Sequence, residues 1–297
     1  MSSLDDGGAR ADVRPTDRLT ASERLNFLLT NRIPRHAFTR FMGWYSRIEN
    51  PVLARASIAV WQWFVDDLRL EEAAEHRFES VHECFTRRLR PDARPLDPRP
   101  EILISPCDAV IGAHGPLRGL EALQAKGFPY RIDDLLGDPR AAEALTEGHY
   151  VTLRLKSSMY HRLHAPAGGS IDHIRYISGD TWNVNPVALK VIERLFCKNE
   201  RVVFPFRLGA EGPVLYLVAV AAVLVASVRI HGLEAPLDLA YRGPNRIRLD
   251  RDYRRGEELG YFEHGSTVVV LAPRGLRPCP ELKTGAVIRM GQPLLQR

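Results

Sequence analysis

A serine that directly follows a glycine, in Gly265-Ser266-Thr267, supplies the residue types needed for a self-cleaving peptide bond. Glycine lets the backbone bend so that the Ser266 hydroxyl can meet the Gly265 carbonyl carbon. Attack there moves the acyl group from nitrogen to oxygen, and base-promoted elimination from the resulting ester breaks the chain. The dehydroalanine left behind loses ammonia to water and becomes a pyruvoyl group. Its ketone can form an imine with an amine substrate and accept electrons when carbon dioxide leaves.

The same tripeptide is common in turns, so the alternative is that Ser266 is a turn residue before a strand at residues 268–271. A serine hydroxyl is a poor nucleophile at neutral pH and needs a general base. Histidine, with an ordinary pKa of about 6.5, suits that role. Two histidines lie three residues apart in Tyr160-His161-Arg162-Leu163-His164-Ala165-Pro166. The alternative for this segment is a pair of surface histidines.

Two further segments carry polar residues in patterns that could serve such a site. Asp108 follows a short apolar stretch in Ile104-Ser105-Pro106-Cys107-Asp108, where an Asx-turn is the alternative. Asn185, Asn199, Glu200 and Arg201 are candidates for hydrogen bonds to the site or to a phosphate. Loop capping and a salt bridge beside a strand are the alternative for this second group.

Together these segments resemble the phosphatidylserine decarboxylase family, from about Phe78 to the C-terminus and more loosely through the preceding helices. The resemblance includes the closing segment Ile288-Arg289-Met290-Gly291-Gln292-Pro293-Leu294. It implies a proenzyme that cuts itself between Gly265 and Ser266, leaving a β chain of residues 1–265 and an α chain of residues 266–297. Covalent pyruvate formed from Ser266 is the implied cofactor, and no metal is implied.

The resemblance also assigns roles to individual residues. Asp108 would orient His164, and His164 would activate Ser266 as a general base. His161 would correspond to the family's histidine for substrate and decarboxylation, and we hypothesise that it is the acid. Asn185, Asn199 and Arg201 are candidates for substrate contacts, and loop capping remains the favoured alternative for each of them. Ala109, Ser157 and Met159 stand where the family usually has glycine, proline and aspartate, and a backbone that needs a positive φ would strain Ala109.

Composition sets broad limits on the class of protein. The chain has 297 residues, 45% hydrophobic and 26% charged, with a net charge of +5, which is typical of a globular protein. This mild positive charge favours an anionic membrane surface or an acidic ligand and does not indicate nucleic acid. The cysteines are far apart without a CxxC pair, so neither a disulfide framework nor a zinc site is expected, and a reducing cytoplasm fits best: Cys84, Cys107, Cys197 and Cys279.

The elements that must position these residues divide the chain into three parts. Residues 1–17 are polar and predict a disordered tail without a signal peptide. Residues 18–89 predict helices at 23–29, 34–48, 51–68 and 71–88, the middle two carrying aromatic residues with basic neighbours. Such a pattern is typical of an amphipathic helix at a membrane surface, and a helical pair packed on the protein body is the alternative.

Residues 90–297 predict a catalytic domain rich in β structure. Four prolines in residues 90–100 indicate a boundary, and short Val/Ile/Leu runs with frequent Gly and Pro follow. The apolar run at residues 214–228 is too short to span a bilayer, so it predicts buried strands. Helices are expected near residues 131–136, 140–146 and 186–195. The predicted fold class is α+β, with a mainly antiparallel β catalytic body after amphipathic helices.

The resulting functional hypothesis is pyruvoyl-dependent decarboxylation of phosphatidylserine to phosphatidylethanolamine. The expected partners are an anionic phospholipid surface, phosphatidylserine and the chain's own α and β fragments as a heterodimer, with a homo-oligomer also allowed. The expected location is peripheral, on the cytoplasmic face of the cell membrane. Two alternatives remain open: a pyruvoyl decarboxylase for a soluble amino acid, and a non-catalytic membrane-associated β protein.

Overall fold

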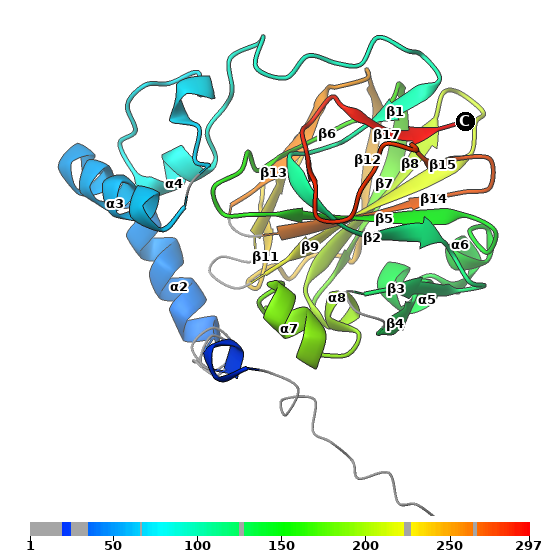
Figure 1. Cartoon of the computed structure of the whole chain (residues 1–297), viewed down its shortest axis with the longest axis horizontal. Helices are drawn as coiled ribbons and strands as arrows, with labels where there is room; N and C mark the ends of the chain where they lie inside the picture. Colours follow the sequence, from blue (N-terminus) through cyan, green and yellow to red (C-terminus); the bar gives the residue numbers. More distant parts are fainter. Residues whose placement is uncertain (1–19, 25–34, 66, 125–127, 223–226, 264–265) are drawn as a thin grey trace, which may run out of the picture.

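The strand β14 (Ser266–Ala272) lies inside the largest sheet of the computed structural model, which describes residues 20–24, 35–65, 67–124, 128–222, 227–263 and 266–297. It pairs antiparallel with β5 (His149–Leu155) on one side and with β9 (Val214–Ala221) on the other (Figure 1). Successive side chains of a strand point to opposite faces. Val268 and Val270 therefore enter one hydrophobic core, and Val269 and Leu271 enter a second core.

The large sheet has eight strands in the order β12-β7-β8-β9-β14-β5-β2-β16, and every neighbouring pair is antiparallel. Its remaining strands are β2 (Ala109–Pro116), β7 (Gly169–Ile177), β8 (Arg201–Leu208), β12 (Arg246–Tyr253) and β16 (Val287–Ile288). This arrangement confirms the predicted α+β class with a mainly antiparallel β body.

Three smaller sheets complete the β structure. The four-stranded sheet has the order β11 (Leu237–Asp238), β10 (Ser227–Ile230), β13 (Glu258–Phe262) and β6 (Arg162–His164). The three-stranded sheet has the order β1 (Ile102–Ile104), β17 (Pro293–Gln296) and β15 (Arg277–Pro278). A two-stranded sheet pairs β3 (Glu121–Leu123) with β4 (Pro129–Arg131). In β13, glycine is needed at position 260, because an added Cβ would lie 2.0 Å from the Arg229 carbonyl oxygen.

Short helices lie near the lower part of the β body in Figure 1, and their apolar residues belong to the second of the two cores. They are α5 (Ile132–Leu136), α6 (Pro139–Glu143), α7 (Pro186–Val191) and α8 (Leu195–Lys198). The first two confirm the helices expected near residues 131–136 and 140–146. The helix expected at residues 186–195 is divided, because Arg194 has a φ of 56° and starts a separate turn.

Two longer helices, α2 (Arg35–Ser46) and α3 (Pro51–Phe64), extend away from the β body in Figure 1. They confirm the helices predicted at residues 34–48 and 51–68, with earlier ends. The Asn50 side chain caps α3 by accepting hydrogen bonds from the Val52 and Leu53 amides, both 3.0 Å long. Residues 21–24 are helical, and the rest of the helix expected at residues 23–29 lies outside the described residues, as does the tail at residues 1–17.

The single helix predicted for residues 71–88 is wrong. That region contains a short 3-10 turn, η2 (Leu70–Glu72), and a five-residue helix, α4 (Val81–Phe85). Ala73 instead forms an antiparallel bridge with Leu89, so the chain between them folds back on itself. Ser80 then starts α4 by accepting a 3.1 Å hydrogen bond from the Glu83 amide. Tertiary pairing and a local cap outweigh helical propensity here.

The apolar run at residues 214–228 forms strand β9 and the start of β10, which confirms the prediction of buried strands for its described residues. Residues 223–226 lie outside the described residues. Among the helices in the described part of the chain, none combines the length and apolar character needed to cross a bilayer.

Candidate active site

The segment predicted to be cut lies at a junction between two sheets. Ser266 begins β14, where its backbone pairs with Leu155 of β5 and Ala221 of β9. Residues 258–262 before it form β13 of the four-stranded sheet. Gly265 lies outside the described residues, and so does the Ser266 side chain. Strand pairing therefore fixes the Ser266 backbone on both sides, and the strand before it belongs to a different sheet.

His164 ends β6, opposite Glu258 in β13, and its side chain is 6% exposed. Its Nδ1 lies 2.9 Å from the Gly256 carbonyl oxygen, and its Nε2 lies 2.9 Å from the Tyr160 hydroxyl. A carbonyl oxygen only accepts hydrogen bonds, so Nδ1 carries the proton and Nε2 accepts the proton of Tyr160. Burial lowers the pKa of His164, so the ring is neutral near pH 7. His164 therefore has the protonation state of a general base.

Asp108 is a buried carboxylate that precedes β2. Its charge is balanced by Arg94, from the proline-rich segment at residues 90–100, rather than by a histidine. Arg94 donates to it from Nε at 2.9 and 3.1 Å and from Nη2 at 2.5 Å. The Met290 amide donates a further 2.8 Å hydrogen bond. Arg94 also contacts Glu72 at 2.7 Å. Ala109, next to it, pairs with Ile288 and is not among the described residues with positive φ.

His161 lies nearer the chain that leads to Ser266. Its carbonyl oxygen accepts a 3.0 Å hydrogen bond from the Phe262 amide. Its ring stacks on Phe85 with 4.0 Å between centroids, and its Nε2 donates to the Lys156 carbonyl at 2.9 Å. Burial, with the nearby positive charge of Arg87, lowers the pKa of His161 to about 3. Nδ1 is then a buried lone pair with no hydrogen-bond partner among the described residues.

Asp108 and His164, which were predicted to contact each other, lie on neighbouring segments of the chain. Between Asp108 and His164 the described residues show no direct hydrogen bond, although the His164 amide donates to the Pro106 carbonyl at 2.8 Å. Burial is the main influence on both pKa values, lowering that of His164 and raising that of Tyr160, and the Asp108 charge is a minor influence on each. Tyr160 and Asp108 also line the same narrow cleft. Asp108 and His164 are therefore close without a direct hydrogen bond, and the Tyr160 hydroxyl is hydrogen-bonded to His164 Nε2.

Sequence reasoning did not single out Tyr160, Arg94 or Glu263 as functional residues. Tyr160 lies inside the histidine motif, and Arg94 precedes a proline in the segment at residues 90–100. Their positions therefore gave a weak indication that both could be functional. Glu263 is 2% exposed and lies three residues before Ser266. It contacts Arg47 at 2.8 Å, Arg229 at 3.4 Å and His82 at 3.7 Å. Nothing in the local sequence predicts those contacts.

Asn185, Asn199 and Arg201 contact the chain's own backbone. Asn185 caps α7 by accepting from the Ala188 amide at 2.8 Å. The Asn199 side chain, fully buried, donates to the Ala221 carbonyl at 2.9 Å and thereby braces the residue opposite Ser266. The substrate-binding role that the sequence suggests for these residues stays a prediction.

The Arg201 guanidinium donates hydrogen bonds to backbone carbonyls of several segments. It donates to Leu135 at 2.7 Å, Asp134 at 2.8 Å and Cys197 at 2.7 Å. Neighbouring Glu200 accepts a hydrogen bond from the Tyr176 hydroxyl, and burial raises the pKa of Glu200 to about 7. These contacts match the loop-bracing alternative more closely than a phosphate site.

Comparisons with known proteins identify the family of the chain. A family model described as phosphatidylserine decarboxylase matches residues 81–296. A protein of Shewanella baltica named phosphatidylserine decarboxylase proenzyme is 33% identical over 91% of this chain and 96% of its own length. A Myxococcus xanthus protein of the same name is 35% identical over 88% of this chain and 94% of its own length. The chain therefore belongs to the phosphatidylserine decarboxylase family, a family of carboxy-lyases.

Proposed function

We propose that this protein converts phosphatidylserine to phosphatidylethanolamine with a pyruvoyl group that it makes by cutting its own chain between Gly265 and Ser266. One observation carries the proposal beyond the family relationship. Ser266 begins a strand that is paired on both sides, and β13, which leads to it, pairs with β6, which ends at the buried neutral histidine His164. A serine nucleophile needs a neutral general base, and these pairings hold both residues on connected strands.

In the proposed cleavage the Ser266 hydroxyl oxygen bonds to the Gly265 carbonyl carbon while the peptide C–N bond breaks, which gives an ester. Removal of the Ser266 Cα proton then breaks the Cβ–O bond, and Gly265 leaves as a carboxylate. Water replaces the nitrogen of the resulting dehydroalanine, and ammonia departs. A base is therefore needed twice, first for the hydroxyl proton and then for the Cα proton.

We assign the base to His164, supported by Asp108. Nδ1 of His164 donates to the Gly256 carbonyl, so its basic lone pair is on Nε2. The Tyr160 hydroxyl that now donates to Nε2 must move aside or pass a proton on when His164 takes the proton of Ser266. The negative charge of Asp108 favours the imidazolium that forms. Arg94 and the Met290 amide keep Asp108 in place for this.

The residues around this segment fit a small polar cofactor at position 266. His161 Nδ1 and the Ser227 hydroxyl are buried and have no partner among the described residues. The backbones of these two residues bond to Phe262 and Glu263, which lead directly to the site. When formed, a pyruvoyl group supplies a ketone that accepts the electron pair released as carbon dioxide leaves. We expect His161 to deliver the proton that replaces the carboxylate, because a nearby anionic substrate would raise its low pKa.

The two fragments would remain one body after cleavage. The α fragment, residues 266–297, contributes β14 between β5 and β9. It also supplies β16 beside β2 and β17 beside β1. These pairings support the expected heterodimer. Exposed apolar side chains of α2 and α3 support docking on a membrane surface, which we assign to the cytoplasmic face: Phe41, Trp44, Val52, Val60, Trp63 and Phe64.

Intact mass spectrometry of the purified full chain tests the proposal. We expect two fragments, the smaller beginning with a pyruvoyl group in place of Ser266, and carbon dioxide release from phosphatidylserine but not from free amino acids. The Ser266→Ala variant should remain one chain. An uncut wild-type chain, or a small fragment with an ordinary amino terminus, would overturn the proposal. Release from free serine would instead identify a soluble amino acid as the substrate.

A further inference from the structure

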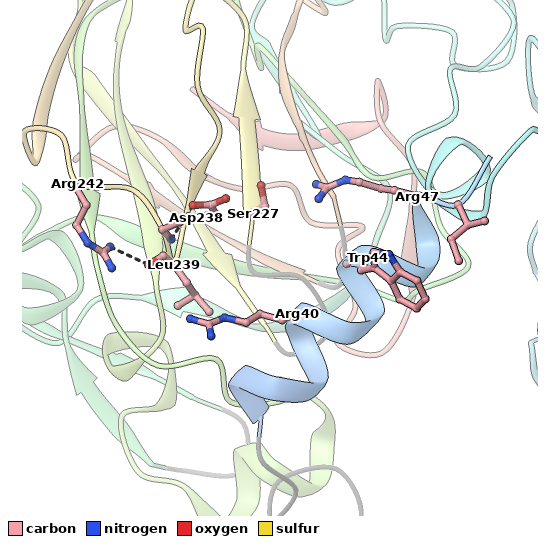
Figure 2. A pocket seen from close by; sticks show the side chains of 10 residues that line it. Arg40, Trp44, Arg47, Ser227, Asp238, Leu239 and Arg242 are labelled. Carbon is pink, nitrogen blue, oxygen red and sulfur yellow. Dashed lines mark hydrogen bonds between the residues drawn. The ribbon is translucent and has the colours of Figure 1, made fainter.

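A cavity of about 630 Å³ separates α2 from the β10–β11 corner of the four-stranded sheet (Figure 2). Arg40, Trp44 and Arg47 line it from α2 and the residue after it, and Ser227, Asp238 and Arg242 line it from the sheet side. Its volume lies in the range of small-molecule sites, roughly 300–1,000 Å³. It shares no lining residue with the narrow cleft that contains Asp108 and Tyr160.

The lining carries an excess of positive charge. Within the described ranges, no ion pair is seen for Arg40 or Arg242. Arg242 uses Nη1 for the Leu239 and Tyr241 carbonyls, and the rest of its guanidinium has no described partner. Figure 2 shows Arg40 extending from α2 toward Leu239, with Arg242 on the other side of Leu239. Guanidinium groups suit phosphate because their planar N–H donors match its oxygens.

The inner wall of the cavity has a different chemistry. Ser227 and Asp238 are register partners across β10 and β11. The Ser227 hydroxyl is buried without a partner among the described residues, which is costly unless a ligand or water satisfies it. Asp238 accepts from the Ala240 amide through one carboxylate oxygen. Its negative charge favours an ammonium group beside it.

This inner wall adjoins the proposed reaction site. The Ser227 carbonyl accepts a 3.1 Å hydrogen bond from the amide of Glu263, three residues before Ser266. The outer side is apolar, because Trp44 on the cavity rim is 64% exposed and Phe41 on the same helix is 52% exposed. A ligand that joins a phosphate, an amine and hydrocarbon tails would match this order of arginines, carboxylate and aromatic rim.

We propose that the cavity binds the head group of an aminophospholipid, with its phosphodiester on Arg40 and Arg242 and its ammonium end toward Asp238 and Ser227. The inference rests on the proposed function, because the ammonium end is the part that must reach position 266. It commits to a membrane lipid rather than to free phosphate, since only a lipid uses the exposed apolar rim.

Binding of short-chain lipids to the full-length Ser266→Ala protein tests this, because that protein does not consume its ligand. In calorimetric titrations with monomeric dihexanoylphosphatidylserine, Arg40→Ala and Arg242→Ala should each raise Kd at least tenfold. Arg40→Lys should have a smaller effect, because lysine keeps the charge and loses the planar fork. Arg55→Ala is the matched control: Arg55 is on α3 and lines a separate cavity, so its removal should change Kd less than twofold.

Dihexanoylphosphatidylglycerol has the same net charge as the serine lipid but no amine. It should bind more weakly, and Asp238→Asn should abolish that preference. Equal losses for Arg40, Arg242 and Arg55 variants, or none, would overturn the proposal, and so would inorganic phosphate binding as tightly as the lipid. These titrations do not depend on cleavage or on carbon dioxide release. A failure of the proposed chemistry with this binding pattern intact would therefore leave the lipid site standing.

Discussion

At the scale of single residues, burial and backbone carbonyls decide what the two motif histidines can do. His161 and His164 each have one ring nitrogen bound to a carbonyl oxygen, which fixes the proton on that nitrogen. Burial lowers the pKa of both. Both rings therefore present a lone pair on the other nitrogen at neutral pH, which suits proton uptake.

The two histidines should affect different steps, His164 the self-cleavage and His161 the decarboxylation. His164→Ala and Asp108→Ala should slow self-cleavage by about 10²–10⁴-fold, the usual contribution of general acid–base catalysis. His161→Ala should still be cut but should release little carbon dioxide. Gel analysis of the fragments and carbon dioxide assays measure the two steps. His173→Ala, which changes a surface histidine on β7, should alter neither. Native cleavage rates in both the His164 and Asp108 variants would rule out the base assignment.

His161 should also make the folded state sensitive to acid. Its pKa is about 3 in the folded chain and near 6.5 when unfolded, so between these values the unfolded chain binds the extra proton. The free energy of unfolding therefore falls as pH drops through this window, by up to about 1.4 kcal/mol per pH unit from this residue. Urea unfolding at pH 7.5 and 5.5 should show a smaller loss for His161→Gln than for wild type. Parallel pH profiles would contradict this.

At the scale of elements, β13 is attached to the N-terminal helices through one buried carboxylate. Glu263 follows β13 and contacts Arg47 after α2, Arg229 in β10 and His82 in α4. Arg162 in β6 makes a second connection, donating to the Thr86 carbonyl at 2.6 Å and to Glu258 at 2.7 Å. The helical region and the strand leading to Ser266 are therefore held as one unit.

Removing the charge of Glu263 should lower the free energy of unfolding more than removing the charge of Arg47. Glu263→Gln leaves Arg47 and Arg229 without their shared anion and should lower the free energy of unfolding by about 2 kcal/mol, between the values for exposed and buried pairs. Arg47→Gln should cost less than about 1 kcal/mol, because Arg229 and His82 remain near Glu263. Urea unfolding measures both. The exposed pair of Glu147 and Arg274 gives the control, since Glu147→Gln should have almost no effect. Equal values for Glu263→Gln and Glu147→Gln would contradict the buried cluster.

At the scale of the whole molecule, the exposed apolar side chains are concentrated on the two helices that extend from the β body. Trp63 and Phe64 at the end of α3 are 84% and 81% exposed, and Trp44 on α2 is 64% exposed. Figure 1 shows these helices to one side of the sheets that hold the candidate site. A membrane covering the helices would leave the β body in water beside it.

Replacing Trp63 and Phe64 together with serine should weaken binding to vesicles of phosphatidylglycerol and phosphatidylcholine at least tenfold. Each large apolar side chain contributes about 1.5–3 kcal/mol when it leaves water. Co-sedimentation measures the binding, and self-cleavage should continue because neither residue contacts the β body's candidate site. Leu123→Ser, which changes an exposed apolar residue of β3, is the control. Undiminished sedimentation of the double variant would remove the membrane role of α3.

The sequence alone was sufficient for the fold class and for most elements, because these depend on local patterns. Short Val/Ile/Leu runs with frequent Gly and Pro predicted the antiparallel body, and aromatic residues with basic neighbours predicted α2 and α3. Local patterns failed at residues 71–88, where the bridge between Ala73 and Leu89 breaks the helix. The motif segments also indicated the family, while the roles of Asp108, His161, His164 and Ser266 stay predictions.

Only the tertiary structure decided which groups meet. Arg47 and Glu263 are separated by 216 positions, and Arg289 and Glu72 by 217. The pairing of Asp108 with Arg94, the proton positions on the two histidines and the arginine-lined cavity likewise depend on segments brought together by sheet pairing. Hydrogen bonds and charge interactions act over a few ångströms of space, and one-dimensional spacing does not specify such distances once the chain has folded back on itself.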